Sequence, residues 1–249
     1  MEKKAKIIAT LGPAIYSESK LKQLVNLGVD AFRINFSHNT NGVSKIVSRI
    51  RKIEKNTRKK ISLIADLQGV KLRVGKIRNE NQKIKYNQKF IFDNKNEVGT
   101  NRRIAFAYPQ ILKKLKKGNK ILIDDGKFIF IVTKKKGNSV HTVCKSQNCY
   151  MKSNKSVHIQ NMDIAFNKLT IKDKKDIKSA IKLGCNWIAL SYIQNEKLIL
   201  EARKLIKKDI GIISKIENKH ALKNIVNIIK ATDSIMIARG DLAIDIGHS

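Results

Sequence analysis

The chain has 249 residues, of which 52 are Lys or Arg and 20 are Asp or Glu, so its formal net charge is +32. Hydrophobic residues make up 42% of the sequence, which suffices for a sizeable core and excludes a disordered polycation. The longest apolar stretches, such as residues 187–193, are far shorter than the roughly 20 residues of a membrane-spanning helix, so no such helix is predicted.

Short apolar segments alternate with helical patterns in the first part of the chain. Strands are predicted at residues 6–11, 31–36 and 61–67, and helices at residues 20–27 and 43–53. Ser17 is the expected N-cap of the first helix. Three βα steps within about 67 residues indicate a parallel α/β sheet or barrel.

A different pattern follows at residues 76–160 and predicts an inserted all-β domain. Its alternating segments predict strands at residues 89–92, 120–123, 128–133 and 139–143. The sequence Asp124-Asp125-Gly126 is most simply a hairpin turn between two of them. This segment holds 20 basic and 5 acidic residues, a charge that fits either a lid over anionic ligands or an ordinary solvated surface.

The βα pattern returns after the insert. It predicts helices at residues 173–183, 195–208 (capped by Asn195) and 219–230, and strands at residues 187–193, 211–216 and 234–238. The expected divisions are therefore 1–75 and 161–249 for the α/β part and 76–160 for the insert. Six βα units at about 27 residues each fall short of the roughly 250 residues of a closed eight-unit barrel.

The basic composition has two explanations. The sequence contains 42 Lys, 38 Ile and 22 Asn, and these three residue types share A/T-rich codons, so a codon-biased genome accounts for the charge. The alternative is a protein that binds a polyanion. Because the Lys residues are scattered, we expect no specific nucleic acid partner. Cys144, Cys149 and Cys185 are predicted to be reduced structural thiols of a cytoplasmic protein rather than a zinc site.

The second predicted strand ends in polar side chains. Since side chains alternate across a strand, Arg33, Asn35 and Ser37 share one face, while Ile34 and Phe36 take the other. The planar fork of an Arg suits a phosphate or carboxylate, and Asn and Ser oxygens suit an alkali cation. The alternative is an edge strand with one solvent-exposed face.

Charged residues also end three other predicted strands. Lys215 and Glu217 share a face; a Lys among apolar neighbours is costly unless it meets an anion, and the carboxylate could hold a divalent metal. Asp241 could bind magnesium or manganese, and Gly240 allows close approach of a ligand to the backbone. Asp66 ends the third strand. The alternatives are a surface Lys–Glu pair and a plain strand-to-helix turn.

Taken together and in order, these motifs resemble the pyruvate kinase family. The resemblance rests on the sequences KIIATLGP at residues 6–13, RINFSH at 33–38, ADLQG at 65–69, DDG at 124–126, LTIKD at 169–173, ISKIEN at 213–218 and IARGDL at 237–242. It covers nearly all of this chain and about the first half of a typical member. The implied fold is α/β, a TIM-barrel (β/α) type incomplete at six βα units, with a small all-β domain inserted after the third strand.

The resemblance implies phosphoryl transfer from phosphoenolpyruvate to ADP, giving pyruvate and ATP, with Mg²⁺ (or Mn²⁺) and usually K⁺. Arg33 and Lys215 would be catalytic and contact the transferring phosphoryl group. Glu217 and Asp241 would bind the divalent metal, and Gly240 would lie against the substrate.

Two further sets of residues follow from the same resemblance. Asn35, Ser37, Asp66 and the backbone carbonyl of Leu67 would hold potassium, and the nucleotide phosphates would meet His38 and Arg73. Members of the family are cytoplasmic and form homo-oligomers through parts that this stretch does not contain. The alternatives are a catalytically impaired fragment or split-gene remnant, a different metal-dependent barrel enzyme, and a basic polyanion-binding protein without enzyme activity.

Overall fold

The computed structural model describes residues 5–37, 42–160, 162, 166, 168–206 and 209–246. Its internal contacts divide the chain into two units, Met1–Val70 with Phe166–Arg239 and Lys71–Ala165 with Gly240–Ser249. The divisions expected at residues 75 and 160 stay a prediction, and the contacts group Gly240–Ser249, which we expected in the barrel part, with the second unit.

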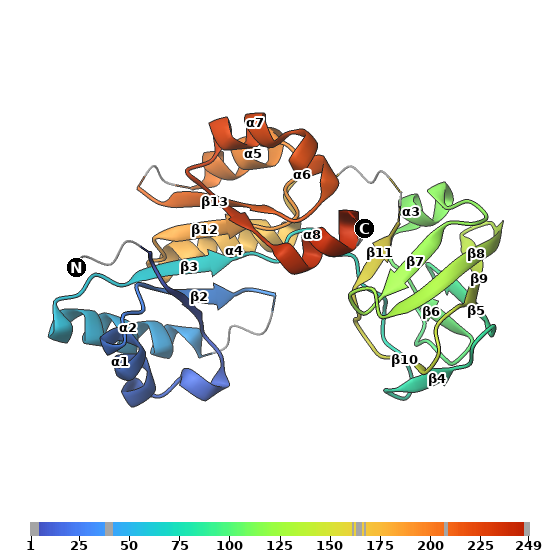
Figure 1. The fold of residues 1–249 in the computed structure, drawn as a ribbon, viewed down its shortest axis with the longest axis horizontal. Coiled ribbons are helices and arrows are strands. Elements are labelled where there is room, and N and C mark those ends of the chain that lie inside the picture. Colours follow the sequence, from blue (N-terminus) through green and yellow to red (C-terminus); the bar gives the residue numbers. More distant parts are fainter. Residues whose placement is uncertain are drawn as a thin grey trace. The chain divides into compact units, whose positions relative to one another are not determined.

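A six-stranded parallel sheet forms the centre of the first unit, with strand order β1-β2-β3-β12-β13-β14. Its strands are β1 (Ile8–Thr10), β2 (Ala31–Asn35), β3 (Ser62–Asp66), β12 (Trp187–Leu190), β13 (Gly211–Ile216) and β14 (Ser234–Ile237). The helices are α1 (Glu18–Asn26), α2 (Val43–Thr57), α4 (Ile171–Lys182), α5 (Glu196–Leu205), α6 (Lys219–Lys223) and α7 (Ile225–Ala231). A short 3₁₀ helix, η1 (Pro13–Ile15), comes before α1. Figure 1 shows the helices around the outside of this curled sheet. The predicted α/β fold of barrel type is confirmed.

Local sequence explains where several of these helices begin. The Ser17 hydroxyl accepts a hydrogen bond from the Lys20 amide, and the Asn195 side chain accepts one from Lys197, so both predicted N-caps are confirmed. Thr170 and Asp173 form a reciprocal capping box at the start of α4.

Several predicted boundaries differ from the structure by a few residues, and three differences affect the course of the chain. The helix predicted at residues 219–230 is broken at Asn224, whose side-chain amide donates to the Gln194 carbonyl. The strand predicted at 187–193 ends at Leu190, because Tyr192 adopts a left-handed backbone with φ of 55°. At Arg239 a helix, α8 (Arg239–Ile246), begins directly rather than after a turn.

Each strand of the parallel sheet presents two different faces. The outer face packs against the helices and includes the fully buried Phe32, Leu63 and Ile212. On the inner face, a separate small layer joins Ala31, Ile64, Ala189 and Ile213, with Met236 of β14 beside it. Nearer the carboxyl ends of the strands, the inner-face positions are instead polar, as at Arg33, Asp66 and Lys215.

The second unit is mostly β-structure. One sheet has the order β11-β7-β8-β9-β5-β6, and a second pairs β10 with β4. The elements are β4 (Gln82–Ile84), β5 (Lys89–Asp93), β6 (Arg103–Ala105), α3 (Pro109–Lys114), β7 (Lys120–Ile123), β8 (Phe128–Lys136), β9 (Ser139–Cys144), β10 (Cys149–Met151) and β11 (Val157–Ile159). The rings of Phe90, Phe92 and Phe130 lie 5.3–5.4 Å apart in its core.

The turn between β7 and β8 is the predicted hairpin turn. Asp124, Asp125 and Gly126 all have positive φ, at 55°, 54° and 89°. Such a backbone matches the twist of a tight hairpin and favours Asp and Gly.

Two other sequence predictions concern cysteines and membranes. All three cysteines are buried thiols outside any disulfide. Among the described residues, no helix combines the length and apolarity needed to cross a bilayer.

Candidate functional site

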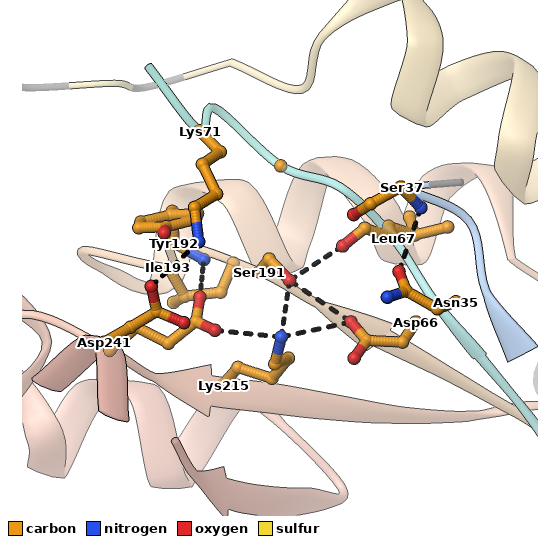
Figure 2. A network of polar contacts seen from close by, with 12 residues as sticks. Asn35, Ser37, Asp66, Leu67, Lys71, Ser191, Tyr192, Ile193, Lys215 and Asp241 are labelled. Atoms are coloured by element: carbon orange, nitrogen blue, oxygen red, sulfur yellow. Dashed lines mark hydrogen bonds and ion pairs between the residues drawn. The ribbon is translucent and has the colours of Figure 1, made fainter. Parts of the chain in front are cut away.

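The polar groups of the first unit meet at the carboxyl ends of β2, β3, β12 and β13. Figure 2 shows the central contacts. We call Arg33, Asp66, Ser191, Lys215 and Glu217 the strand-end cluster. The predicted alternation holds in β2, since Ile34 and Phe36 are buried on the outer face while Arg33 and Asn35 are only partly buried on the other.

Lys215 lies at the centre of the cluster. Its Nζ is 2.8 Å from Glu217 Oε1 and 3.2 Å from Asp66 Oδ1, and it donates to Ser191 Oγ at 2.8 Å. The side chains of Glu217 and Asp66 are 1% and 2% exposed, so these are buried ion pairs. The surface Lys–Glu pair considered from the sequence is therefore wrong.

The two carboxylates determine the protonation state of Lys215. Burial by itself lowers the pKa of this amine, but the negative charges of Glu217 and Asp66 outweigh it and raise the pKa above its ordinary value. Lys215 is consequently a permanent ammonium at neutral pH, held in a low-dielectric site where its field on a bound anion is strong.

Asp66 also connects Lys215 to Arg33. The Arg33 Nε donates to Asp66 Oδ2 at 2.6 Å, and its Nη1 donates to Thr10 Oγ1 at 3.0 Å. These two bonds fix the plane of the guanidinium at the strand end. The Asp66 carboxylate thus lies between the Arg33 and Lys215 cations, which would otherwise repel each other.

The four residues predicted to hold potassium come from β2, β3 and the segments that follow them. Asn35 and Asp66 are direct register partners, and Asn35 Oδ1 accepts from the Ser37 amide at 3.0 Å. The Leu67 carbonyl and Asp66 Oδ1 both accept from the Ser191 hydroxyl, at 2.7 and 3.2 Å. The structure therefore brings Asp66 and the Leu67 carbonyl to one hydroxyl, with Asn35 on the adjacent strand.

Ser191 is a residue that the sequence analysis missed. It directly follows β12 and links the Leu67 carbonyl, Asp66 and Lys215 through one hydroxyl. The available signal was its position at the end of an apolar strand, the same signal that singled out Arg33 and Lys215.

Replacing Ser191 by Ala should lower the free energy of unfolding by about 1–3 kcal/mol, because the buried Lys215 and Leu67 groups lose a partner. Urea unfolding monitored by circular dichroism measures this. Ser179→Ala removes a hydroxyl that bonds a backbone carbonyl on the exposed side of α4, and it should cost less than half as much. Equal losses in the two variants would contradict this role of Ser191.

Tyr192 connects the backbone to Glu217. Its amide donates to Glu217 Oε2 at 2.6 Å, and its φ of 55° is uncommon for a residue other than Gly. This left-handed turn directs the amide at the carboxylate. Glu217 is thereby held from one side by Lys215 and from the other by the backbone.

A second missed residue, Asp173, holds the loop after β3. Its Oδ1 accepts from the Gly69 amide at 3.0 Å, while its other oxygen closes the capping box with Thr170. Gly69 has a φ of 62°, and a Cβ on it would lie 2.5 Å from the Ser191 carbonyl oxygen. The loop can pass this close to Ser191 only with Gly at this position.

Three of the remaining predicted site residues are in the second unit. Gly240 and Asp241 are in the second unit, where Asp241 Oδ1 lies 3.1 Å from Lys71 Nζ. Arg73 donates to the Asn154 carbonyl at 2.8 Å in the same unit. Their predicted roles beside Glu217 and Lys215 stay predictions. His38 lies outside the described residues.

The donor set favours hard cations over zinc. Within the described ranges, no three side chains of His, Cys, Asp or Glu come together as a metal-binding group. The oxygens at the strand ends instead belong to Asn35, Asp66, the Leu67 carbonyl and Glu217. Amide, carbonyl and carboxylate oxygens suit alkali and alkaline-earth ions.

Comparison with known proteins identifies the family of this chain. The family model for "Pyruvate kinase, barrel domain" matches residues 2–249. The chain is 32% identical to a pyruvate kinase of Clostridium perfringens, over 98% of this chain and 52% of the relative. It is 33% identical to pyruvate kinases of Geobacillus stearothermophilus and Dictyostelium discoideum, covering 43% and 50% of those proteins. The chain thus spans about half the length of these relatives, and it belongs to the pyruvate kinase family.

Proposed function

We propose that this chain carries the phosphoryl-binding part of a pyruvate kinase site, which transfers a phosphoryl group from phosphoenolpyruvate to ADP in glycolysis. The observation that carries the proposal is the buried Lys215 ammonium, tied through Asp66 to the Arg33 guanidinium at adjacent strand ends. Phosphoryl transfer depends on positioning and on positive charge around the equatorial oxygens, and it needs no protein nucleophile.

Each cation has a separate role in this proposal. Arg33, oriented by its bonds to Asp66 and Thr10, would bind the phosphoryl oxygens through its planar fork. The Lys215 ammonium would stabilise the charge that develops on the transferring group and on the enolate oxygen. The Lys215 position is fixed by contacts on three sides, so little reorganisation is needed when charge develops.

The charge balance of the strand-end cluster supports a need for additional cations. Its two cations and two carboxylates cancel, so an anionic substrate would enter a site without net positive charge. We propose that Glu217 and Asp241 hold Mg²⁺ or Mn²⁺, and that Asn35, Ser37, Asp66 and the Leu67 carbonyl hold K⁺. When bound, such ions neutralise substrate oxygens and act as Lewis acids.

The proposal also covers the ADP-binding residues, the cellular compartment and the oligomeric state. Arg73 and His38 would meet the ADP phosphates, and the reaction would take place in the cytoplasm. Phosphoenolpyruvate and ADP are small soluble anions, so neither a membrane nor a nucleic acid is required as a partner. Homo-oligomers are expected for full-length members of the family.

The direct test is product formation. Purified chain, incubated with phosphoenolpyruvate, ADP, Mg²⁺ and K⁺, should release pyruvate and ATP in equal amounts, and omission of either ion should reduce the rate at least about tenfold. Because β1 and β14 each pair with one strand only among the described residues, we expect a rate well below that of the Clostridium perfringens relative assayed alongside. Tight, sequence-selective RNA binding with a steep salt dependence and no pyruvate would favour the polyanion-binding alternative.

A further inference from the structure

Cys144 and Cys149, two thiols of the second unit, have no part in the proposed function. They lie at the two ends of a short loop, residues 145–148, which connects β9 to β10. We propose that these two cysteines form a reversible disulfide when the protein meets a peroxide, which makes the pair a redox-sensitive site. The inference concerns the second unit alone, and it does not rest on the proposed function.

Backbone pairing brings both cysteines to one turn. Cys149 on β10 is the register partner of Ile84, the last residue of β4. The Cys144 carbonyl accepts from the Asn87 amide at 2.8 Å, and the Cys144 amide donates to the Gln88 carbonyl at 3.0 Å. The turn between β4 and β5 starts after Ile84 and ends at Gln88, so the cysteines pair with its opposite ends.

The two side chains are in contact inside the protein. Both are 0% exposed, and one thiol forms a hydrogen bond with the other. The Sγ atom of Cys144 also lies 3.6 Å from the Ser146 carbonyl oxygen, within the loop. A disulfide has an S–S distance of about 2 Å and needs side chains that point toward each other. Two hydrogen-bonded thiols already have this orientation and need only a small further approach.

The contact makes the two thiols chemically unequal. The hydrogen bond with Cys149 stabilises a thiolate on Cys144 and lowers the pKa of Cys144, although burial acts against this effect. The same hydrogen bond, together with burial, raises the pKa of Cys149. In the first unit, burial raises the pKa of Cys185 to about 11. Cys144 is therefore the expected nucleophile, and Cys149 is the thiol that completes the disulfide.

The reaction has two steps. The Cys144 thiolate attacks one oxygen of hydrogen peroxide, the O–O bond breaks, and the hydroxide that leaves takes up a proton, so Cys144 becomes a sulfenic acid. The Cys149 sulfur then attacks the sulfenic sulfur, the S–S bond forms, and the S–O bond breaks as hydroxide leaves with the Cys149 proton. Two thiols are oxidised to one disulfide, and one peroxide is reduced to two waters. An external dithiol reverses the change by thiol–disulfide exchange.

The loop that covers the pair is the route by which a peroxide reaches it. Lys145, Gln147 and Asn148 are exposed, and Asn148 has a left-handed backbone with φ of 50°. Local opening of a short exposed loop costs much less free energy than unfolding of the unit. Hydrogen peroxide is small enough to enter through such an opening.

A metal ion or a purely structural role fits the pair less well. Structural zinc takes four ligands, and within the described ranges no third side chain of His, Cys, Asp or Glu joins the two thiols. A structural Cys acts as a small apolar side chain, which gives no reason for two of the chain's three thiols to meet.

Peptide mapping after peroxide treatment tests the proposal. The reduced full chain is treated with hydrogen peroxide, with free glutathione in a parallel tube to verify that the peroxide is active, and the remaining thiols are alkylated. Trypsin cleaves after Lys145, so the disulfide should join peptides 137–145 and 146–152, and dithiothreitol should separate them. Most of the chain should carry this crosslink, while Cys185 stays a free thiol.

Three outcomes of the peptide map would overturn the proposal. They are recovery of unchanged Cys144 and Cys149, their oxidation to sulfinic acids without a crosslink, and a disulfide that joins two chains or includes Cys185. The map needs no enzyme activity, so failure of the proposed function would leave its result unchanged.

Matched variants assign the role of each thiol. Cys149→Ser should stop at the sulfenic acid of Cys144, which dimedone labels, and Cys144→Ser should react with peroxide at least about tenfold more slowly at Cys149. Cys185→Ser is the control and should form the crosslink at the wild-type rate. Circular dichroism verifies the folding of each variant. Equal dimedone labelling of Cys149→Ser and Cys144→Ser would contradict the assigned roles.

Unfolding the wild-type chain shows whether the fold creates the selectivity, and it requires no variant. In urea the contact between the two thiols is lost, so peroxide should consume Cys185 as fast as Cys144. If Cys144 were consumed just as selectively in urea as in the folded chain, its reactivity would not come from the structure and the proposal would be wrong.

Discussion

Replacing Lys215 by Met should reduce pyruvate formation by at least about 10²–10³-fold, because the site loses the one ammonium that its carboxylates hold in place. The same change should lower the free energy of unfolding by about 3–5 kcal/mol, since Glu217 and Asp66 stay buried without their shared cation. Steady-state kinetics and urea unfolding measure the two effects separately.

Two companion variants separate catalysis from folding. Lys215→Arg keeps a positive charge, so it should recover part of the stability, but the wider planar guanidinium cannot replace a compact ammonium and activity should stay low. Lys178→Met removes an exposed Lys from α4 and should change neither quantity appreciably. An active Lys215→Met enzyme would contradict the role given to this residue.

Replacing Gly69 by Ala should be nearly as damaging, for a steric reason. The new Cβ would lie 2.5 Å from the Ser191 carbonyl oxygen and 2.9 Å from its carbonyl carbon, so backbone must move. The φ of 62° adds the cost of a left-handed residue. We expect a loss of about 2–4 kcal/mol in unfolding free energy and a clear loss of activity, since Ser191 contacts Lys215.

Gly184 supplies the matched control. It has a similar φ of 70°, and a Cβ on it would meet nothing within 4 Å. Gly184→Ala should therefore cost only the backbone penalty, about 1–2 kcal/mol, and leave activity unchanged. If the two substitutions lowered stability equally in urea unfolding, the close approach of Gly69 to Ser191 would be unimportant.

The part of the site that could be predicted from the sequence lies on strands with a period of two. Arg33 and Asn35 alternate with buried apolar residues, and Lys215 and Glu217 lie on either side of the buried Ile216, so the shared faces follow from strand geometry alone. The confirmed N-caps, Ser17 and Asn195, were equally local signals.

What escaped prediction depends on contacts between distant parts of the chain. Ser191 meets Lys215 across 24 residues and Leu67 across 124, and a single Ser after an apolar run carries no sign of either partner. Asp173 belongs to a local helix cap, but its carboxylate also accepts a hydrogen bond from the amide of Gly69, 104 residues away. Strands such as β4, β6, β10 and β11 contain three residues each, too few for a recognisable alternation.

The central claim is that Lys215 and its partners bind the phosphoryl group of phosphoenolpyruvate, and calorimetric titration of the chain with this compound tests it most directly. With Mg²⁺ and K⁺ present, wild type and Lys178→Met should bind phosphoenolpyruvate saturably, and Lys215→Met should bind it at least tenfold more weakly. Equal affinity in wild type and Lys215→Met, or no binding by the folded wild-type chain, would contradict the claim.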